Sequence, residues 1–211
     1  MKYRLLVAAV FVLAACAPSA PHNTGVYLLL DTSGTYSTEL KKAEHIVLYM
    51  LSRLEPTDSL AVARIDTGSF SEKDIVAKAT FDDRPSMANR QKRTFAGEVQ
   101  QFVRFAGTSS YTDISGGLLQ AIEFLNEKAP GRKAILIFSD LKEDLAEGYV
   151  RNVPLDLKGF EVVALNVTKL RSDNFDPREY LDRVEMWRSR VEDAGGSWRM
   201  INDLERLEGL L

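Results

Sequence analysis

Short apolar runs and amphipathic stretches alternate along the chain, and this pattern predicts alternating strands and helices. Residues 26–30 (VYLLL) and 134–138 (AILIF) are continuous apolar runs, which is typical of strands that are covered on both faces. Two further apolar runs, at residues 60–65 and 160–167, predict strands of the same kind.

Two more strands are expected. In residues 75–81 the apolar side chains alternate with Lys78 and Thr80, which predicts a strand with one face near water, at an edge of the sheet. Residues 198–201 predict a last short strand.

Four stretches place apolar residues on one helical face. They lie within residues 38–55, 95–103, 114–125 and 181–194, and Asp113 is a natural N-cap for the third. Because strands and helices alternate, the sequence predicts an α/β fold: a doubly wound, mostly parallel six-stranded sheet with helices on both faces.

The composition fits one globular domain and narrows the choice of partners. Of the 211 residues, 45% are hydrophobic and 27% are charged, and the formal net charge is −3. Because the charges are nearly balanced, we do not expect nucleic acid or an anionic membrane surface as a partner.

The amino terminus has the layout of an export signal. In residues 1–15, Lys2 and Arg4 precede an apolar run of eleven residues. As a helix that run would span about 16 Å, roughly half of the hydrocarbon core of a bilayer. We therefore expect a cleaved signal and no transmembrane anchor.

The single cysteine, Cys16, follows Leu13, Ala14 and Ala15. This LAAC resembles the lipobox of bacterial lipoproteins, which implies that Cys16 becomes the lipidated first residue of the mature chain. The alternative is an ordinary signal cleaved near Ala15 that leaves a spare thiol. Ala17 differs from the Asp that marks inner-membrane retention in lipoprotein families, which favours the outer membrane, on its periplasmic face, in a cell with two membranes.

These observations predict three segments. Residues 1–15 form the signal, residues 16–23 carry the lipidated cysteine and a short extended tether, and residues 24–211 form one domain.

Two acidic residues lie just after predicted parallel strands. Asp31 comes after residues 26–30, and Asp140 comes after residues 134–138 and one serine. In open α/β sheets, ligands bind beyond the carboxyl ends of the strands, near the point where the strand order reverses. We therefore expect both carboxylates at one rim of the sheet.

Hydroxyl residues accompany these acids. Asp31, Ser33 and Thr35 lie in the sequence DTSGT, Thr112 precedes the predicted N-cap of the third helix, and Asp140 follows later. This order resembles the metal-ion-dependent adhesion site of von Willebrand factor A (VWA) domains, whose pattern is DxSxS, a downstream threonine, and an aspartate at the end of a strand. The order of elements over residues 24–205 is similar too.

The resemblance implies that these five residues hold Mg²⁺ or Mn²⁺ and that a carboxylate of a partner protein completes the coordination. The chemistry is consistent, because Mg²⁺ prefers oxygen ligands and keeps several waters. The hydroxyls would bind directly, whereas Asp31 and Asp140 would act mostly through water.

Three points leave alternatives open. Leu141 stands where the family often has glycine, which is expected to reshape the rim. Thr108, Ser109 and Ser110 lie in the same loop as Thr112 and are alternative ligands. Capping of loops and turns alone is the other interpretation of all these side chains, since Asp, Ser and Thr commonly serve that purpose.

The stretch LLLDTSGTY also resembles the first motif of haloacid-dehalogenase-like phosphatases, DxDGT, in which the first Asp is the nucleophile. Asp140 and Asp144, in SDLKED, resemble the late acidic pair of that family. However, Ser33 occupies the position of the second Asp of DxDGT, which is the general acid. A serine hydroxyl has no suitable pKa for that task. Lys133 also directly abuts a predicted strand, unlike the lysine of that family.

We therefore expect a cell-envelope lipoprotein without catalytic function whose VWA-like domain binds a protein partner through a divalent metal ion. A scaffold that uses the fold without the metal is the second hypothesis.

Overall fold

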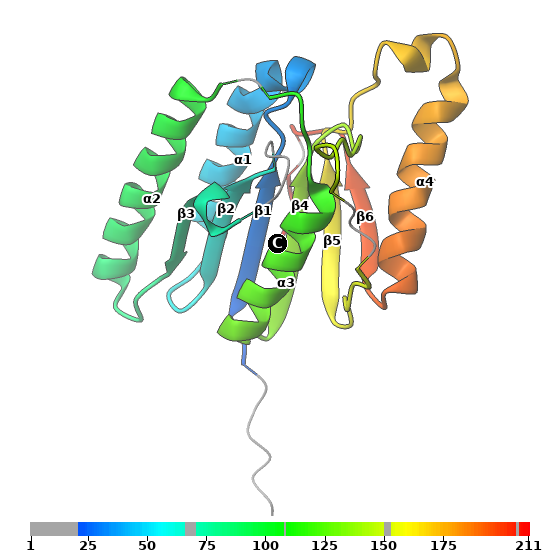
Figure 1. Ribbon diagram of the computed structural model, residues 1–211. Coiled ribbons are helices and arrows are strands. Elements are labelled where there is room, and N and C mark those ends of the chain that lie inside the picture. Colours follow the sequence, from blue (N-terminus) through cyan, green and yellow to red (C-terminus); the bar gives the residue numbers. More distant parts are fainter. Residues whose placement is uncertain (1–20, 66–70, 108, 150–152, 206) are drawn as a thin grey trace, which may run out of the picture.

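The computed structural model describes residues 21–65, 71–107, 109–149, 153–205 and 207–211. Its centre is a six-stranded sheet with the strand order β3-β2-β1-β4-β5-β6 (Figure 1). The strands are β1 Thr24–Leu30, β2 Ser59–Arg64, β3 Ile75–Thr80, β4 Arg132–Phe138, β5 Phe160–Leu165 and β6 Ser197–Ile201.

Four α-helices and three short 3-10 helices connect the strands. The α-helices are α1 Leu40–Arg53, α2 Pro85–Phe105, α3 Ile114–Lys128 and α4 Pro177–Asp193. The 3-10 helices are η1 Gly34–Glu39, η2 Glu72–Asp74 and η3 Ser172–Asn174.

The sheet is mostly parallel, as the sequence predicts. Every neighbouring pair is parallel except β2 and β3, which are antiparallel. The strand β3 lies at one edge of the sheet, which confirms the position inferred from its alternating pattern. The order reverses between β1 and β4, so the carboxyl ends of these two strands lie side by side at the switch point.

The sheet is covered on both faces because alternate residues of one strand point to opposite sides. In β1, Leu28 and Leu30 pack with α1 and α2 on one face, together with residues of the carboxyl-terminal segment. Tyr27 and Leu29 pack with α3 and α4 on the other face. This arrangement explains why the strand is apolar at consecutive positions.

The helix α4 differs from the sequence prediction at one position. Leu181, Trp187 and Val191 fit one helical face by spacing, and the latter two are fully buried, but Leu181 is 62% exposed. The connection before α4 and the start of this helix rise above the carboxyl end of β6 (Figure 1). Leu181 therefore does not belong to the buried face of this helix.

Residues 1–20, which include the predicted signal, Cys16 and most of the tether, lie outside the described residues. Within the part of the chain that is described, no helix combines the length and hydropathy that a membrane-spanning segment requires.

Candidate metal site

The carboxyl ends of β1 and β4 bring the two predicted acids to one rim. The Asp31 N–H donates to the carbonyl of Phe138 over 3.0 Å, continuing the ladder between β1 and β4 by one residue. Asp31 therefore lies beside Ser139, and Asp140 follows directly. Asp31 is 0% exposed and Asp140 is 5% exposed, so both carboxyl groups are largely removed from water.

Hydroxyl and main-chain groups of Ser33, Thr112 and Ser139 reach the Asp31 carboxylate. The main-chain N–H of Ser33 donates to Oδ1 over 2.8 Å, and the Ser139 hydroxyl donates to Oδ2 over 2.6 Å. The Thr112 hydroxyl lies 3.5 Å from Oδ1, at the outer limit of a hydrogen bond. These donors are neutral, so burial prevails and raises the pKa of Asp31 to about 6; the charge of Asp140 acts in the same direction.

Ser33 and Thr35 lie in the turn that follows Asp31. Ser33 pairs with Ser109 in an isolated parallel bridge, and the Gly34 N–H donates to the Ser109 carbonyl over 2.9 Å. Ser33 is half-buried, and the backbone of Thr35 belongs to η1. The side chain of Thr35 lies outside what the structure describes, so its predicted role remains a prediction.

Thr112 is held at the start of α3 by its neighbours. Its main chain exchanges two hydrogen bonds with Asp144, of 2.8 and 2.9 Å. Asp113 caps α3, because its side chain accepts from the Gly116 N–H over 2.7 Å, which confirms the predicted N-cap. Thr112 itself is 2% exposed, and its hydroxyl faces Asp31.

The alternative ligands of the same loop are placed differently. The Ser109 hydroxyl accepts from the Tyr111 N–H over 3.1 Å, which is a local turn contact. Ser110 is exposed, and Thr108 lies outside the described residues. Among the described hydroxyls of this loop, that of Thr112 is the one with a hydrogen bond to Asp31.

Asp140 stands on the β4 side of the rim. Its Oδ1 accepts from the Lys142 N–H over 2.9 Å. Burial raises the pKa of Asp140, although the charges of Arg183 and Lys142 partly oppose this shift. Two buried carboxyl groups, both with a raised pKa, form a place where a cation would stabilise the ionised protein.

Leu141 keeps the backbone geometry that glycine would favour. Its φ is +67°, in the left-handed region, yet its side chain is fully buried. The expectation that this replacement reshapes the rim stays a prediction. The buried side chain holds Leu141 in this conformation, which ordinarily costs a non-glycine residue about 1 kcal/mol or more.

A metal ion at this rim would need ligands besides carboxylates. Within the described residues, no group of three or more His, Cys, Asp or Glu side chains is arranged to hold a metal ion. The oxygen atoms of hydroxyl groups would have to complete the shell, which Mg²⁺ and Mn²⁺ accept readily.

Three residues at this rim were not foreseen from the sequence. Ser139 is bound to Asp31, and its position as the last polar residue before Asp140 was a usable signal. Arg183 donates from Nε to the Asp140 carbonyl over 2.8 Å, and the Trp187 indole N–H donates to the Leu141 carbonyl over 2.9 Å. No local pattern in the sequence connects α4 with this strand end.

The features of the phosphatase motif are separated in space. Lys133 belongs to the amino end of β4, where its ammonium group lies 4.8 Å from the centre of the Phe160 ring. The carboxylates lie at the other end of the same strand. Asp144 contributes main-chain hydrogen bonds to Thr112 and its side chain is exposed.

Comparisons with known proteins were made by sequence and by structure. No protein-family model and no curated protein sequence matches the chain. A von Willebrand factor type A protein from Catenulispora acidiphila has a similar structure, with a TM-score of 0.53 and 14% identity over 89% of this chain and 40% of that one. The chain has a von Willebrand factor A-like fold.

Other solved structures are also similar to this VWA-like domain. The pilus adhesin SpaC from Lactobacillus rhamnosus GG, in an open conformation, matches with a TM-score of 0.55 and 11% identity over 89% of this chain and 28% of that chain. BatB from Bacteroides thetaiotaomicron matches over 85% of this chain and 90% of that chain, with a TM-score of 0.45 and 13% identity. This chain thus spans less than half of the first two proteins.

Proposed function

We propose that this protein is a cell-envelope lipoprotein whose VWA-like domain binds a protein partner through Mg²⁺ or Mn²⁺ and has no catalytic role. The observation that carries the proposal is the pairing of two buried carboxyl groups, Asp31 and Asp140, at the switch point of the sheet with the Thr112 hydroxyl beside them. The hydroxyl and main-chain N–H groups that donate to these carboxyl groups are neutral, and the charges of Arg183 and Lys142 offset burial only partly at Asp140, so a cation would stabilise the ionised pair.

The hydroxyl and carboxylate residues of the rim would have different roles in binding the ion. Hydroxyl groups of Ser33, Thr35 and Thr112 would contact the ion directly, and Asp31 and Asp140 would orient bound water. An ion held mainly by neutral ligands stays electrophilic, so it would attract a carboxylate of the partner. The protein's part is to keep these oxygen atoms fixed and to leave one position open.

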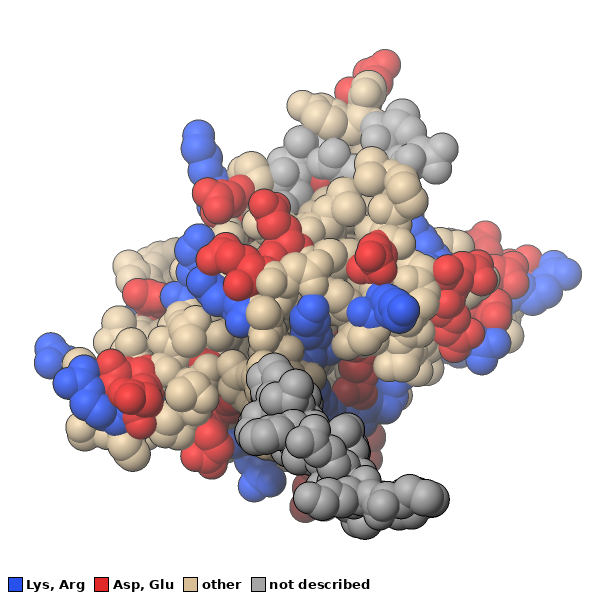
Figure 2. Space-filling view, turned by 90° about the horizontal axis from the view of Figure 1, so that it is seen from below, with Lys and Arg blue, Asp and Glu red and all other residues tan. Residues whose placement is uncertain are grey.

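The location follows from the proposed segments. With residues 1–15 removed and Cys16 lipidated, the tether of residues 16–23 would connect the domain to the membrane, on the periplasmic face of the outer membrane in a cell with two membranes. The face seen from below carries a mixture of acidic and basic side chains (Figure 2). Such a surface would not hold an anionic membrane by charge alone, so the lipid would be the anchor.

The test is a calorimetric titration of Mg²⁺ and Mn²⁺ into the full chain in detergent. We expect saturable one-site binding that weakens at least tenfold in Asp31→Asn. The matched control is Asp58→Asn, because Asp58 is also a buried carboxylate, and it accepts from the main-chain N–H groups of Thr24 and Glu55 over 2.6 and 2.7 Å at the opposite end of the sheet. This control should bind the ion as the parent does.

Two results would overturn the proposal. Absence of binding in all three proteins would assign the rim residues to turn capping and favour a metal-independent scaffold. Equal loss in both variants would show that affinity follows general stability and not the site.

A further inference from the structure

Three residues on one face of α4 contact the rim of the sheet or the start of α3. Arg183, Trp187 and Arg190 are spaced four and three residues apart, so they project from the same side of the helix. Each makes a hydrogen bond to a candidate metal ligand or to a residue one to three positions after one.

Arg183 is fixed by an ion pair. Its Nη1 and Nη2 donate to the two carboxylate oxygens of Asp173 over 3.2 and 2.9 Å, while its Nε donates to the Asp140 carbonyl over 2.8 Å. The side chains are 10% and 0% exposed, respectively. Asp173 in turn accepts from the Leu170 N–H over 2.7 Å. The guanidinium group thus binds the Asp173 carboxylate with two nitrogen atoms and the Asp140 carbonyl with the third.

Trp187 holds the next peptide unit. Its indole N–H donates to the Leu141 carbonyl over 2.9 Å, and the whole side chain is buried. Two successive carbonyl groups, those of Asp140 and Leu141, are therefore bound to α4. This contact favours the left-handed backbone of Leu141, which lies directly after the candidate ligand.

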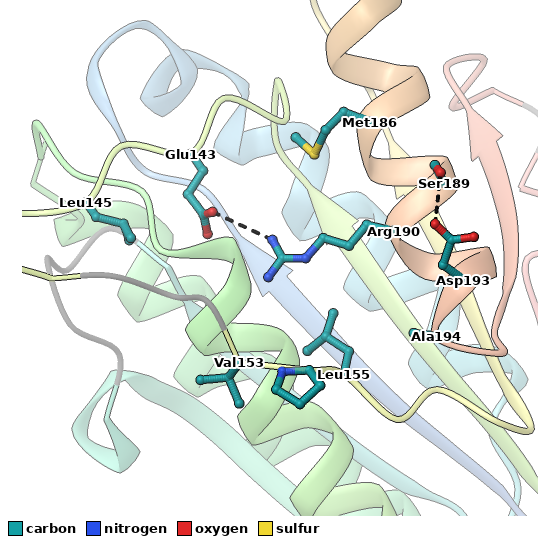
Figure 3. Close-up of a pocket in the computed structure, with 10 residues that line it drawn as sticks. Glu143, Leu145, Val153, Leu155, Met186, Ser189, Arg190, Asp193 and Ala194 are labelled. Atoms are coloured by element: carbon teal, nitrogen blue, oxygen red, sulfur yellow. Dashed lines mark hydrogen bonds and ion pairs between the residues drawn. The ribbon is translucent and has the colours of Figure 1, made fainter.

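Arg190 extends the contact to the start of α3. Its Nη1 donates to the Ser115 hydroxyl over 2.7 Å and lies 3.9 Å from Glu143. Glu143 accepts from the Ser115 N–H over 2.7 Å. Figure 3 shows Arg190 pointing from α4 toward Glu143, beside a groove of about 850 Å³. Ser115 lies three residues after Thr112. The helix α4 therefore contacts both the segment after β4 and the start of α3.

We propose that Arg183, anchored by Asp173, is a positioning residue that sets the metal affinity of the rim by fixing the peptide after Asp140. This inference rests on the proposed function. A side chain that held α4 in place could have used any carbonyl of the strand end, but Arg183 binds the carbonyl of the candidate ligand itself. Groups that orient metal ligands from outside the first layer typically change affinity 10- to 100-fold when they are replaced.

The test compares Arg183→Lys with Arg188→Lys in the full chain in detergent. Lysine keeps the charge at position 183 but cannot bind a carboxylate with two donors while a third reaches the carbonyl. Arg188 is the control, because it lies on the same helix, is half exposed, and pairs with Glu185 over 2.8 Å. We expect the Mg²⁺ dissociation constant to rise 10- to 100-fold for Arg183→Lys and less than twofold for Arg188→Lys.

A second control and a metal-free readout separate positioning from stability. Val99→Ala removes buried volume on the opposite face of the sheet, and it should lower stability without changing Mg²⁺ affinity. In proton–nitrogen NMR spectra of the metal-free protein, Arg183→Lys should shift the Leu141 amide and the Trp187 indole signals, whereas Arg188→Lys should leave them in place.

The outcomes distinguish the two proposals. If the parent binds Mg²⁺ and Arg183→Lys binds it equally well, or if the Leu141 and Trp187 signals do not move, the positioning role is wrong and the proposed function stands. If the parent itself does not bind Mg²⁺, the proposed function and this inference both fail. A loss of affinity in Val99→Ala as large as in Arg183→Lys would also overturn the positioning role.

Discussion

Asp31 is a single residue whose ionisation is costly in the folded protein. In the described part of the chain, its carboxylate accepts from hydroxyl groups and from the main-chain N–H of Ser33. Because these donors are neutral and the group is buried, the ionised form is less stable in the folded protein than in the unfolded chain. The metal-free domain therefore has a built-in preference for a proton or a cation at this point.

The stability of the metal-free protein should consequently depend on pH. Burial raises the folded-state pKa of Asp31 from its ordinary value of 3.8 to about 6. Between these values the folded state binds more protons than the unfolded state, so stability falls as pH rises and the full penalty is present above about pH 6. The penalty amounts to about 2 to 3 kcal/mol, from 1.36 kcal/mol for each pKa unit.

Urea unfolding at pH 4.5 and pH 7.5, with chelator present, measures this effect. We expect Asp31→Asn to be more stable than the parent at pH 7.5 and to lose less stability between the two values. Excess Mg²⁺ should then reverse the order at pH 7.5, because only the parent would retain the site. An identical change with pH in both proteins would contradict the assignment.

At the scale of residues, the sequence predicted those positions that depend on neighbouring residues in the chain. Asp31 and Asp140 could be placed at one rim, because both follow apolar strands and parallel strands end at the same edge. The contact of Arg183 with Asp140 could not be predicted, since it joins residues 43 positions apart and neither has a distinctive local pattern. The left-handed backbone of Leu141 was also hidden, because a buried leucine usually indicates an ordinary core position.

At the scale of elements, two glycines in the first turn of α3 occupy places where a side chain would not fit. A Cβ at Gly117 would lie 2.8 Å from Ile65 Cγ2 and 2.9 Å from Leu29 Cδ2. A Cβ at Gly116 would lie 2.4 Å from the carboxylate of Asp113, the N-cap of the same helix. The spacing at Gly117 is too short for carbon atoms in contact, so α3 approaches β1 this closely only because Gly117 has no side chain. A side chain at Gly116 would instead displace the Asp113 cap.

Gly117→Ala should therefore destabilise the domain, even though alanine favours helices. Overpacking typically costs about 1 to 3 kcal/mol, which outweighs a gain in helix propensity of about 1 kcal/mol. Gly97→Ala in the exposed part of α2 is the matched control, because no atom lies within 4 Å of its Cβ. It should stabilise by about 0.5 to 1 kcal/mol. Chemical denaturation of both variants checks the pair, and a stabilised Gly117→Ala would contradict the close packing.

Most elements could be predicted because their periodicity is strong. The six strands and four α-helices lie where the apolar patterns place them, although α2 begins at Pro85, ten residues before the apolar pattern in residues 95–103. The strand order could not be inferred, because pairing depends on contacts between distant segments. Leu181 has the spacing of the apolar face of α4 but is exposed, because spacing alone does not show whether another element covers a given side chain.

At the scale of the whole molecule, the chain enters the sheet at the end opposite to the candidate site. Asn23 accepts from the Gly131 N–H over 3.3 Å through its side chain and from the Arg132 N–H over 3.2 Å through its carbonyl. These contacts fix the entry point beside the amino ends of β1 and β4. The seven residues of β1 then carry the chain about 23 Å to the rim at Asp31.

If Cys16 is lipidated, this geometry turns the rim away from the membrane. Lipidation would also consume the single native thiol, so a cysteine introduced elsewhere could be labelled alone. Tyr111→Cys places a dye beside Thr112 at the rim, where the side chain is 41% exposed. Lys158→Cys places the same dye at an exposed position just before β5, at the amino edge of the sheet.

Energy transfer from each dye to acceptor lipids in reconstituted vesicles measures the orientation. We expect stronger transfer from position 158 than from position 111, because the length of β1 separates the two edges. Replacing Cys16 with serine should abolish both signals by releasing the protein. Equal transfer from the two positions would show that the tether lets the domain lie on its side, and stronger transfer from position 111 would place the rim at the membrane. In that last case a partner in solution could not reach the proposed metal site, so the orientation would decide whether the proposed carboxylate ligand is to be sought in solution or on the membrane.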